Sequence, residues 1–137
     1  EACKIAIHAL EVANGNQASS QICHQAIRHM GNDVVKMISA ALDAFARHDI
    51  DGAIEVVRND KLVDQQYASA IRELITYMME DPRSIGQAIN ILWILRAIER
   101  IGDHARNISE QVIYLVSGAD VRHSSLSEME EQTKSDS

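Results

Sequence analysis

Proline, cysteine and aromatic residues are scarce in this chain of 137 residues. It holds one proline, two cysteines, one phenylalanine, one tryptophan and three tyrosines. A β-sandwich or β-barrel of this length needs many turns and many strand-forming segments, so the composition excludes both. Hydrophobic residues make up 46% of the chain and charged residues 24%, which also excludes disorder throughout the chain. Long helices with few interruptions fit this composition better.

The chain also lacks an excess of positive charge and a long apolar segment. Thirteen Lys and Arg residues face twenty Asp and Glu residues, for a net charge of −7, which argues against a general nucleic-acid-binding surface. No apolar stretch approaches the roughly 18–20 residues of a membrane span, because Arg96 interrupts the longest candidate, residues 85–101. No signal peptide is visible, and Cys3 and Cys23 lack CxxC spacing. We therefore expect a cytoplasmic protein with reduced thiols.

Hydrophobic residues recur at steps of three and four positions, which is the spacing of one helical face. The predicted helices are about 27, 28 and 35 residues long, or roughly 40–50 Å at 1.5 Å per residue. Short connections between them force neighbouring helices to run antiparallel. The three apolar stripes run from Ile27 to Ala44, from Ala53 to Met78, and from Ile91 to Leu115.

Capping residues mark the ends of these helices. The first begins at two serines at positions 19–20, and Asp51 is predicted to cap the N-terminus of the second. Asp81 caps the third helix, with Pro82 at its first position, where a missing N–H costs nothing. Gly118 ends this helix, since glycine readily adopts the left-handed conformation found at helix C-termini.

The sequence therefore predicts an all-α fold, an antiparallel up-down-up three-helix bundle over residues 20–118. Residues 1–15 add a short extra helix at the N-terminus. Residues 119–137 form a C-terminal tail that we expect to be mostly disordered, because it is polar and loses the helical periodicity.

Two pairs of acidic residues stand at helical spacing. Asp60 and Asp64 fall in the second stripe, where core residues are expected. Glu99 and Asp103 repeat the same spacing on the third helix, and each pair lies on one helical face. Carboxylates brought within about 4 Å of one another repel by roughly 4 kcal/mol per pair at an effective dielectric constant of 20. Something must offset that repulsion.

A bound cation is one way to do so. Carboxylates together with an amide or an imidazole suit a hard or borderline cation such as Mg²⁺, Mn²⁺ or iron. His104 and Asn107 are near enough in the sequence to join such a ligand set.

Ion pairs along a solvated helix face are the alternative. Arg96 precedes Glu99 by three residues, and Arg106 follows Asp103 by three, so each acid has a local partner of opposite charge. Spacing alone leaves both interpretations open.

Features of an enzyme are weak in this sequence. We find no nucleophile beside a base, no glycine-rich phosphate loop and no basic patch, so nothing argues for catalysis. Ferritin-like metal sites need a Glu-x-x-His motif, which the third helix lacks. His104, between Gly102 and Arg106, could serve in a histidine phosphotransfer bundle. A carboxylate-bridged metalloenzyme or such a phosphotransfer bundle is therefore the alternative function.

The third predicted helix resembles a known sequence signature. Residues 99–110 (ERIGDHARNISE), followed by Tyr114, Gly118 and residues 121–123 (VRH), resemble the signature helix of the PhoU family, the phosphate-uptake regulators of bacteria. The preceding helices carry further similar segments, namely residues 41–45 (ALDAF) with Asp49, and Asp60-x-x-x-Asp64 with Tyr67.

This resemblance implies a metal site. Members of the family contain two tandem three-helix bundles whose E/D-x-x-x-D motifs bind metal ions. Carried over to this sequence, the implied ligands of Mg, Mn or Fe are Asp60, Asp64, Glu99 and Asp103, with His104 and Asn107 as possible supporting groups.

The resemblance also implies a role and partners. The family is not enzymatic; it acts in the cytoplasm, as a homodimer, to restrain a phosphate ABC transporter and its sensor histidine kinase when phosphate is plentiful. The ATPase subunit of the transporter and the kinase are the implied partners. Because this chain holds one bundle, it resembles the C-terminal half of a member. Residues 1–15 would then end a helix of a preceding bundle, and residues 1–6 indeed match residues 104–109 at two positions.

Overall fold

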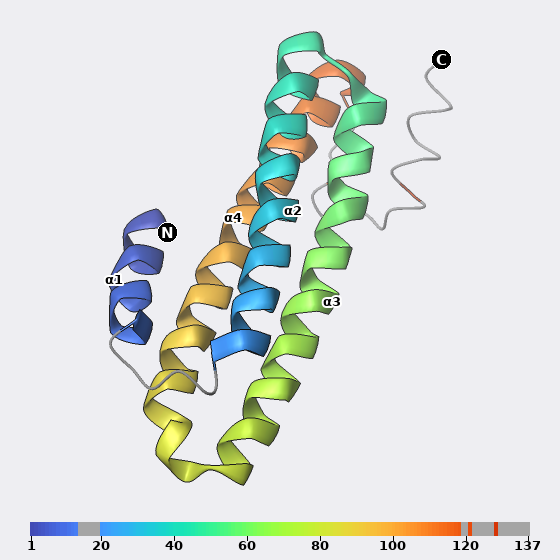
Figure 1. Ribbon diagram of the computed structural model, residues 1–137. Helices are drawn as coiled ribbons and strands as arrows, with labels where there is room; N and C mark the ends of the chain where they lie inside the picture. The colour runs from blue at the N-terminus through green and yellow to red at the C-terminus, as the bar shows by residue number, and fades with distance from the viewer. Residues whose placement is uncertain (14–19, 119–120, 122–127, 129–137) are drawn as a thin grey trace. The chain divides into compact units, whose positions relative to one another are not determined.

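The computed structural model describes residues 1–13, 20–118, 121 and 128 (Figure 1). Within these residues the backbone forms helices and no strand, so the all-α prediction is confirmed. The elements are α1 (Ala2–Ala13), α2 (Ser20–Arg47), α3 (Ile50–Glu80), the short 3₁₀ helix η2 (Pro82–Ser84) and α4 (Ile85–Ser117).

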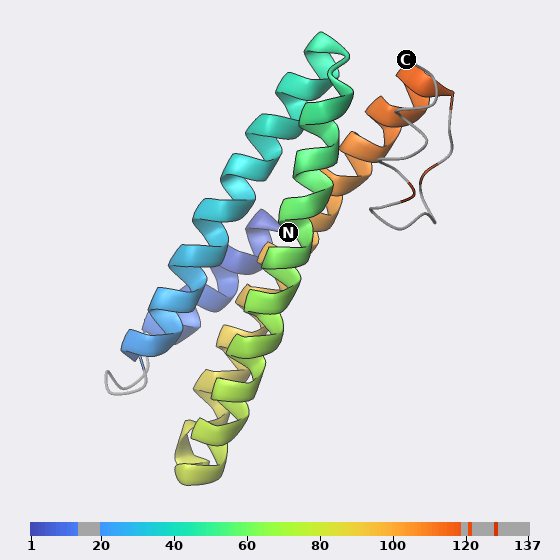
Figure 2. The ribbon, with the colours of Figure 1, turned by 90° about the vertical axis from the view of Figure 1, so that its right-hand side faces the viewer.

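The chain divides into two compact units, and each of the three long helices contributes to both. The first unit comprises residues 1–33 and 63–101, and the second comprises residues 34–62 and 102–137. Within each unit, segments of α2, α3 and α4 lie side by side, with α3 antiparallel to the other two (Figures 1 and 2). This is the up-down-up arrangement that the short connections predict.

A tight turn joins α2 to α3. His48 adopts a positive φ of 56°, which reverses the chain after α2. The Asp49 side chain then accepts a hydrogen bond from the Gly52 backbone N–H at 3.1 Å, so Asp49 is the N-cap of α3. The prediction of Asp51 as the cap was wrong. Because α3 begins at Ile50, Asp51 already lies in its first turn, beyond the capping position.

The predicted start and end of the third helix are confirmed, whereas Ser19, at the predicted start of the first, lies outside the described residues. The Asp81 side chain accepts a hydrogen bond from the Arg83 N–H at 3.1 Å, and Pro82 follows the cap directly. The first three residues form η2 before α4 begins. At the far end of α4, Gly118 has a φ of 74°, and its N–H donates to the Tyr114 carbonyl at 2.9 Å. Glycine adopts this left-handed conformation without a Cβ clash.

Each unit has its own buried side chains, which follow the predicted stripes. In the first unit, Met30 of α2, Leu74 of α3 and Leu95 of α4 are at most 2% exposed. The third stripe ends earlier than predicted: Val112 is buried, but Leu115 is 62% exposed. Because a helix has 3.6 residues per turn, Leu115 lies on a different side of α4 from Val112, and that side faces solvent.

In the second unit the apolar core includes a residue beyond α4. Val121 is fully buried, although it lies in the segment predicted to be a mostly disordered tail. A single apolar residue after the Gly118 turn thus packs back onto the core, and the disorder expected for most of residues 119–137 stays a prediction. The rest of the predicted tail, apart from Glu128, lies outside the described residues. The apolar core cluster of the second unit consists of Ala44, Ala53, Ile54, Val57, Val112, Ile113 and Val121.

Helix α1 belongs to the first unit. Its described side chains are exposed or half-buried, and the Glu1 carboxylate pairs with Arg100 of α4 at 3.3 Å and with Lys4 at 3.5 Å. Burial raises the pKa of the Glu1 carboxyl, but the Arg100 and Lys4 cations outweigh this and hold it below its ordinary value. That α1 ends a helix of a preceding bundle stays a prediction, and residues 14 and 15 lie outside the described part.

None of the described helices is both long enough and apolar enough to cross a membrane.

Candidate functional site

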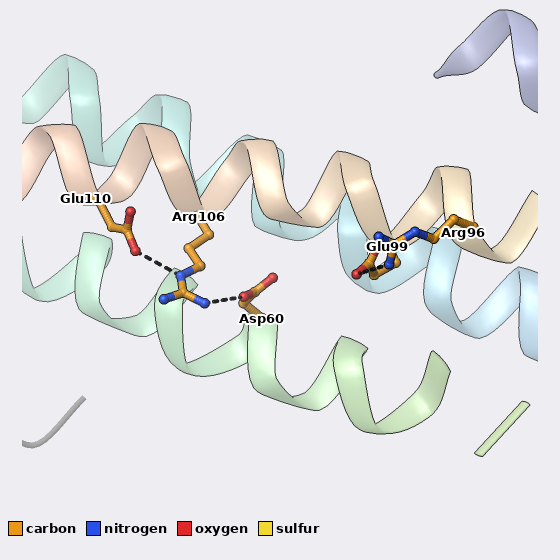
Figure 3. A network of polar contacts seen from close by, with 5 residues as sticks. All are labelled: Asp60, Arg96, Glu99, Arg106 and Glu110. Carbon is orange, nitrogen blue, oxygen red and sulfur yellow. Dashed lines mark hydrogen bonds and ion pairs between the residues drawn. The ribbon is translucent and has the colours of Figure 1, made fainter. Parts of the chain in front are cut away.

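An arginine of α4 joins two buried carboxylates in the second unit (Figure 3). Arg106 Nε donates to Glu110 Oε1 at 2.9 Å, and Arg106 Nη1 donates to Asp60 Oδ2 at 3.3 Å. Asp60 is 1% exposed and Glu110 is 5% exposed, whereas one third of the Arg106 side chain is exposed. The cluster therefore lies inside the unit, with its positive member next to solvent.

Local helix geometry places the α4 part of this cluster. Arg106 and Glu110 are four residues apart, so they occupy the same face of α4. Gly102, one turn before Arg106, is also buried. A Cβ built on it would lie 3.5 Å from Val34 Cγ2 and 3.6 Å from Asp60 Oδ1. These are ordinary van der Waals distances, so a methyl group at Gly102 would just fit beside Asp60.

Arg106 keeps its positive charge in this cluster. Burial lowers the pKa of its guanidinium, but the Glu110 and Asp60 carboxylates outweigh burial and raise that pKa above its ordinary value. A raised pKa adds stability at every pH below the ordinary value, and that stability is lost only as the pH rises above it. Because an ordinary arginine titrates above roughly pH 12, Arg106 stays charged wherever the protein is studied.

A second arginine–carboxylate pair lies in the first unit. Arg96 Nη1 donates to Glu99 Oε1 at 2.8 Å (Figure 3), and Glu99 is only 8% exposed. The Arg96 guanidinium also lies over the ring of Tyr67 of α3, with its Cζ 5.8 Å from the ring centroid. Within 6 Å a cation is attracted by the face of an aromatic ring. The predicted pair of Arg96 with Glu99 is thus confirmed.

The predicted pair of Arg106 with Asp103 was wrong. Arg106 instead bonds to Asp60 and Glu110, which lie deeper in the unit than the half-buried Asp103. A long side chain on a helix can reach a neighbouring helix as easily as its own previous turn. A charged group gains more from partners that are shielded from water.

The six predicted site residues differ widely in burial. Asp60 and Glu99 are buried and Asp103 is half-buried. The other three, Asp64, His104 and Asn107, are exposed. Within the units, Asp60 and Asp103 belong to the second, and Asp64 and Glu99 belong to the first. Their joint role as metal ligands stays a prediction.

The burial of Glu110 was not predicted from the sequence. A local signal for it existed, since Arg106 and Glu110 form an Arg-x-x-x-Glu pair that borders the buried positions Ala105, Ser109 and Val112. A charged pair at that spacing beside a core stripe is a candidate for partial burial. The third member, Asp60, depends on the register of α3 against α4, which the sequence does not contain.

The donor groups are of the type that binds a hard cation, but within the described part of the chain they form no metal site. Among the described residues, no three His, Cys, Asp or Glu side chains form a group that would hold a metal ion. The two buried acids named above nevertheless each hold a cation, because Asp60 binds the Arg106 guanidinium and Glu99 binds that of Arg96. Carboxylate oxygens are the ligands that Mg²⁺ and Mn²⁺ prefer.

Long antiparallel helices with acidic and arginine side chains at their contacts define a helical-bundle protein. Comparison with known proteins then identifies the family. The model of the PhoU domain matches residues 27–112, and the chain belongs to the PhoU family.

Several relatives and a solved structure are similar over most of this chain. A Pseudomonas aeruginosa protein named "Phosphate-specific transport system accessory protein PhoU homolog" is 52% identical over 134 residues, which is 98% of this chain and 54% of that protein. The Escherichia coli K12 protein named "Phosphate-specific transport system accessory protein PhoU" is 47% identical over 97 residues, which is 71% of this chain and 40% of that protein.

A crystal structure of PhoU from Pseudomonas aeruginosa superimposes with a TM-score of 0.66 at 62% identity. The match covers 67% of this chain and 44% of the other. The fold is therefore that of PhoU. The chain spans about half the length of the curated relatives that it matches.

Proposed function

We propose that this protein is a non-catalytic regulator of phosphate transport and of phosphate-responsive signalling in the cytoplasm. It restrains a phosphate ABC transporter, through the ATPase subunit, and the sensor histidine kinase when phosphate is plentiful. The observation that carries the proposal is the 52% identity, over nearly the whole chain, with a relative named as an accessory protein of phosphate-specific transport. A homodimer is the proposed assembly.

Binding to the two partners tests this role directly. The full 137-residue chain is immobilised and offered the detergent-solubilised phosphate transporter and the sensor kinase, with the ATPase subunit of an unrelated ABC transporter as the control. Capture of the phosphate transporter and the kinase, but not of the control subunit, is expected. Failure to capture either partner would overturn the proposal. Light scattering of the free chain measures whether it is dimeric.

The same partners separate this role from phosphotransfer. His104 is exposed, so a kinase could in principle reach its imidazole. We expect the kinase to bind the His104→Gln variant as it binds the wild type, and to leave no phosphate on either protein. Transfer of labelled phosphate that disappears in His104→Gln would establish the phosphotransfer function instead.

We further propose that the protein binds a divalent or trivalent metal ion, of Mg, Mn or Fe. The residue types support this, because carboxylate oxygens are the ligands that these cations prefer. The proposed ligands are Asp60, Asp64, Glu99 and Asp103, with His104 and Asn107 in support.

Thermal melts of an Asp103→Asn variant test the metal proposal. The change keeps the shape and removes one charge, so in chelator the variant should be as stable as the wild type or slightly more stable. Mn²⁺ at 100 times its Kd should stabilise the wild type by about 2.7 kcal/mol, or roughly 11–22 °C in a domain near 100 residues, and the variant much less.

Asp43→Asn is the matched control for this experiment. Asp43 is an exposed acid that pairs with Arg47 at 3.2 Å on α2, and it is not among the proposed ligands. Its variant should show the same Mn²⁺ shift as the wild type. Equal shifts in Asp103→Asn and the wild type would remove Asp103 from the site, and no shift in the wild type would exclude metal binding.

A further inference from the structure

A notch lies between α2 and α3 in the first unit. It has a volume of about 240 Å³, and it is lined by three small side chains, Ala26, Ser69 and Ala70, which leave the space between the two helices unfilled. Met30 and Ala70 also line it and are at most 5% exposed, so they form its floor. The notch is therefore apolar at its base.

Gln66 brings an unsatisfied hydrogen-bond acceptor to one end of this notch. Its Nε2 donates to Asp33 Oδ2 at 3.0 Å, whereas its buried Oε1 accepts no hydrogen bond within the described structure. An ionised carboxylate accepts hydrogen bonds and cannot donate them, so Asp33 holds the nitrogen of this amide and leaves the oxygen without a donor. A buried acceptor without a donor is unfavourable. A donor that enters the notch beside Gln66 would remove that penalty.

Glu73 brings a negative charge to the other end. It follows Gln66 by seven residues, which is about two helical turns and about 10 Å along α3. Its side chain is exposed, and no cation of the described chain forms an ion pair with it. Ser69, between the two, adds a hydroxyl group at the edge. The notch thus offers acceptors at both ends and an apolar floor between them.

These features decide which kind of ligand fits. An anion would be repelled by Glu73, and no Lys or Arg lines the notch to attract it. A metal ion needs more ligands than the one carboxylate present there. A purely apolar ligand would leave the acceptor of Gln66 unsatisfied. An ammonium group, in contrast, carries three donors and a positive charge, and a methylene chain gains free energy when it covers an apolar floor.

We propose that the notch binds an aliphatic diamine or polyamine in an extended conformation. One ammonium group donates to Gln66 Oε1, the other pairs with the Glu73 carboxylate, and the methylene chain between them covers Met30 and Ala70. Because Oε1 is covered in the free protein, the Gln66 amide shifts toward the ammonium group on binding. Nine bonds of an extended chain span about 10–11 Å, so two ammonium groups joined by eight methylene groups match the spacing of the two acceptors. This inference is independent of the proposed regulatory and metal-binding functions.

Octane-1,8-diamine is the probe for the test. It is titrated into the full nitrogen-15-labelled chain, and the side-chain amide signal of Gln66 should shift and saturate in the NMR spectrum. Octylamine has the same carbon chain but one ammonium group, so it should bind about fivefold more weakly, the most that an exposed ion pair contributes. Equal binding of the two probes would mean that the notch takes a single ammonium group, as on a lysine side chain, and would overturn the diamine proposal.

Glu73→Gln removes the charge at one end and keeps the size of the side chain. This variant should bind octane-1,8-diamine about fivefold more weakly than the wild type does, and no better than it binds octylamine. Glu80→Gln is the matched control, because Glu80 is an exposed acid on α3 that does not line the notch. It should bind like the wild type. Equal losses in the two variants would show attraction to the overall negative charge of the chain and would rule out this site.

A third variant fills the notch without changing any charge. Ala26→Leu adds three carbon atoms between α2 and α3, so neither probe should produce a saturable shift of the Gln66 signal. The backbone NMR spectrum shows whether this variant is folded, and the Glu73 and Glu80 variants decide the question if it is not. Undiminished binding by folded Ala26→Leu would place the amine elsewhere, and a wild-type Gln66 signal that does not respond to the diamine would likewise overturn the proposal.

Discussion

Arg106 Nη1 of α4 lies 3.3 Å from Oδ2 of Asp60 on α3, a carboxylate 46 residues earlier in the chain that is almost completely buried. The pair is a charged contact between two helices of the second unit, shielded from water on the side of the acid. Ion pairs on an open surface contribute about 0–1 kcal/mol because water and salt screen them. A pair with one fully buried member depends far more on both partners being present.

Neutralising Asp60 should therefore cost more than neutralising Asp64, one helical turn further along α3. Asp60→Asn weakens a charged hydrogen bond inside the protein, and we expect a loss of about 2 kcal/mol in the free energy of unfolding. Asp64 is exposed, so Asp64→Asn should change it by less than about 0.5 kcal/mol. Urea unfolding of both variants in chelator measures the difference. Equal losses would contradict the burial that distinguishes the two acids.

The start of α3 offers a second matched pair. Asp49 caps this helix by accepting the Gly52 N–H, so Asp49→Ala should lower the free energy of unfolding by about 1 kcal/mol. Asp51 lies in the first turn, where a negative charge gains only about 0.3–1 kcal/mol from the helix dipole. Asp51→Ala should cost less, and 1 M salt should reduce its effect. Chemical denaturation at two salt concentrations measures the free energy of unfolding of each variant. A larger loss for Asp51→Ala than for Asp49→Ala would show that the cap is misassigned.

Two glycines should respond to alanine in opposite directions. Gly118 has a φ of 74°, a conformation that costs an L-residue roughly 1–2 kcal/mol, so Gly118→Ala should destabilise the protein by about that much. Gly31 lies inside α2 with nothing within 4 Å of a built Cβ. Gly31→Ala should stabilise the protein by about 0.5–1 kcal/mol, because alanine is the better helix former. Thermal melts of the two variants decide this, and shifts of the same sign would refute it.

Helix α1 should be the least protected helix of the described chain. Its described side chains bury little, and an ion pair between Glu1 and Arg100 joins it to α4. Amides of α1 should exchange roughly a hundredfold or more faster than those of residues 85–115, since local opening there exposes few apolar contacts. Hydrogen exchange read by NMR resolves the two segments. Equal protection would mean that α1 has a full packing site in this chain, against the prediction that it ends a helix of a preceding bundle.

Much of this protein follows from the sequence by itself, because the features concerned are local. Steps of three and four between apolar residues determine which face of each helix is buried, as Met37 and Leu95 show. The Asp81-Pro82 pair and Gly118 mark two helix ends by chemistry that acts within one turn. The Arg96 pair with Glu99 is also local, three residues apart on one helix. Each of these depends on the helix repeat alone.

Other features were decided only by the tertiary structure. The helix repeat puts Asp60 and Asp64 on one face, yet packing buries the first and leaves the second exposed. Arg106 has carboxylates within reach on its own helix, at Asp103 and Glu110, and on α3, at Asp60. Which of them it binds depends on how far α3 is shifted and rotated against α4. That register results from many small packing contacts spread over both helices, so no short stretch of sequence encodes it.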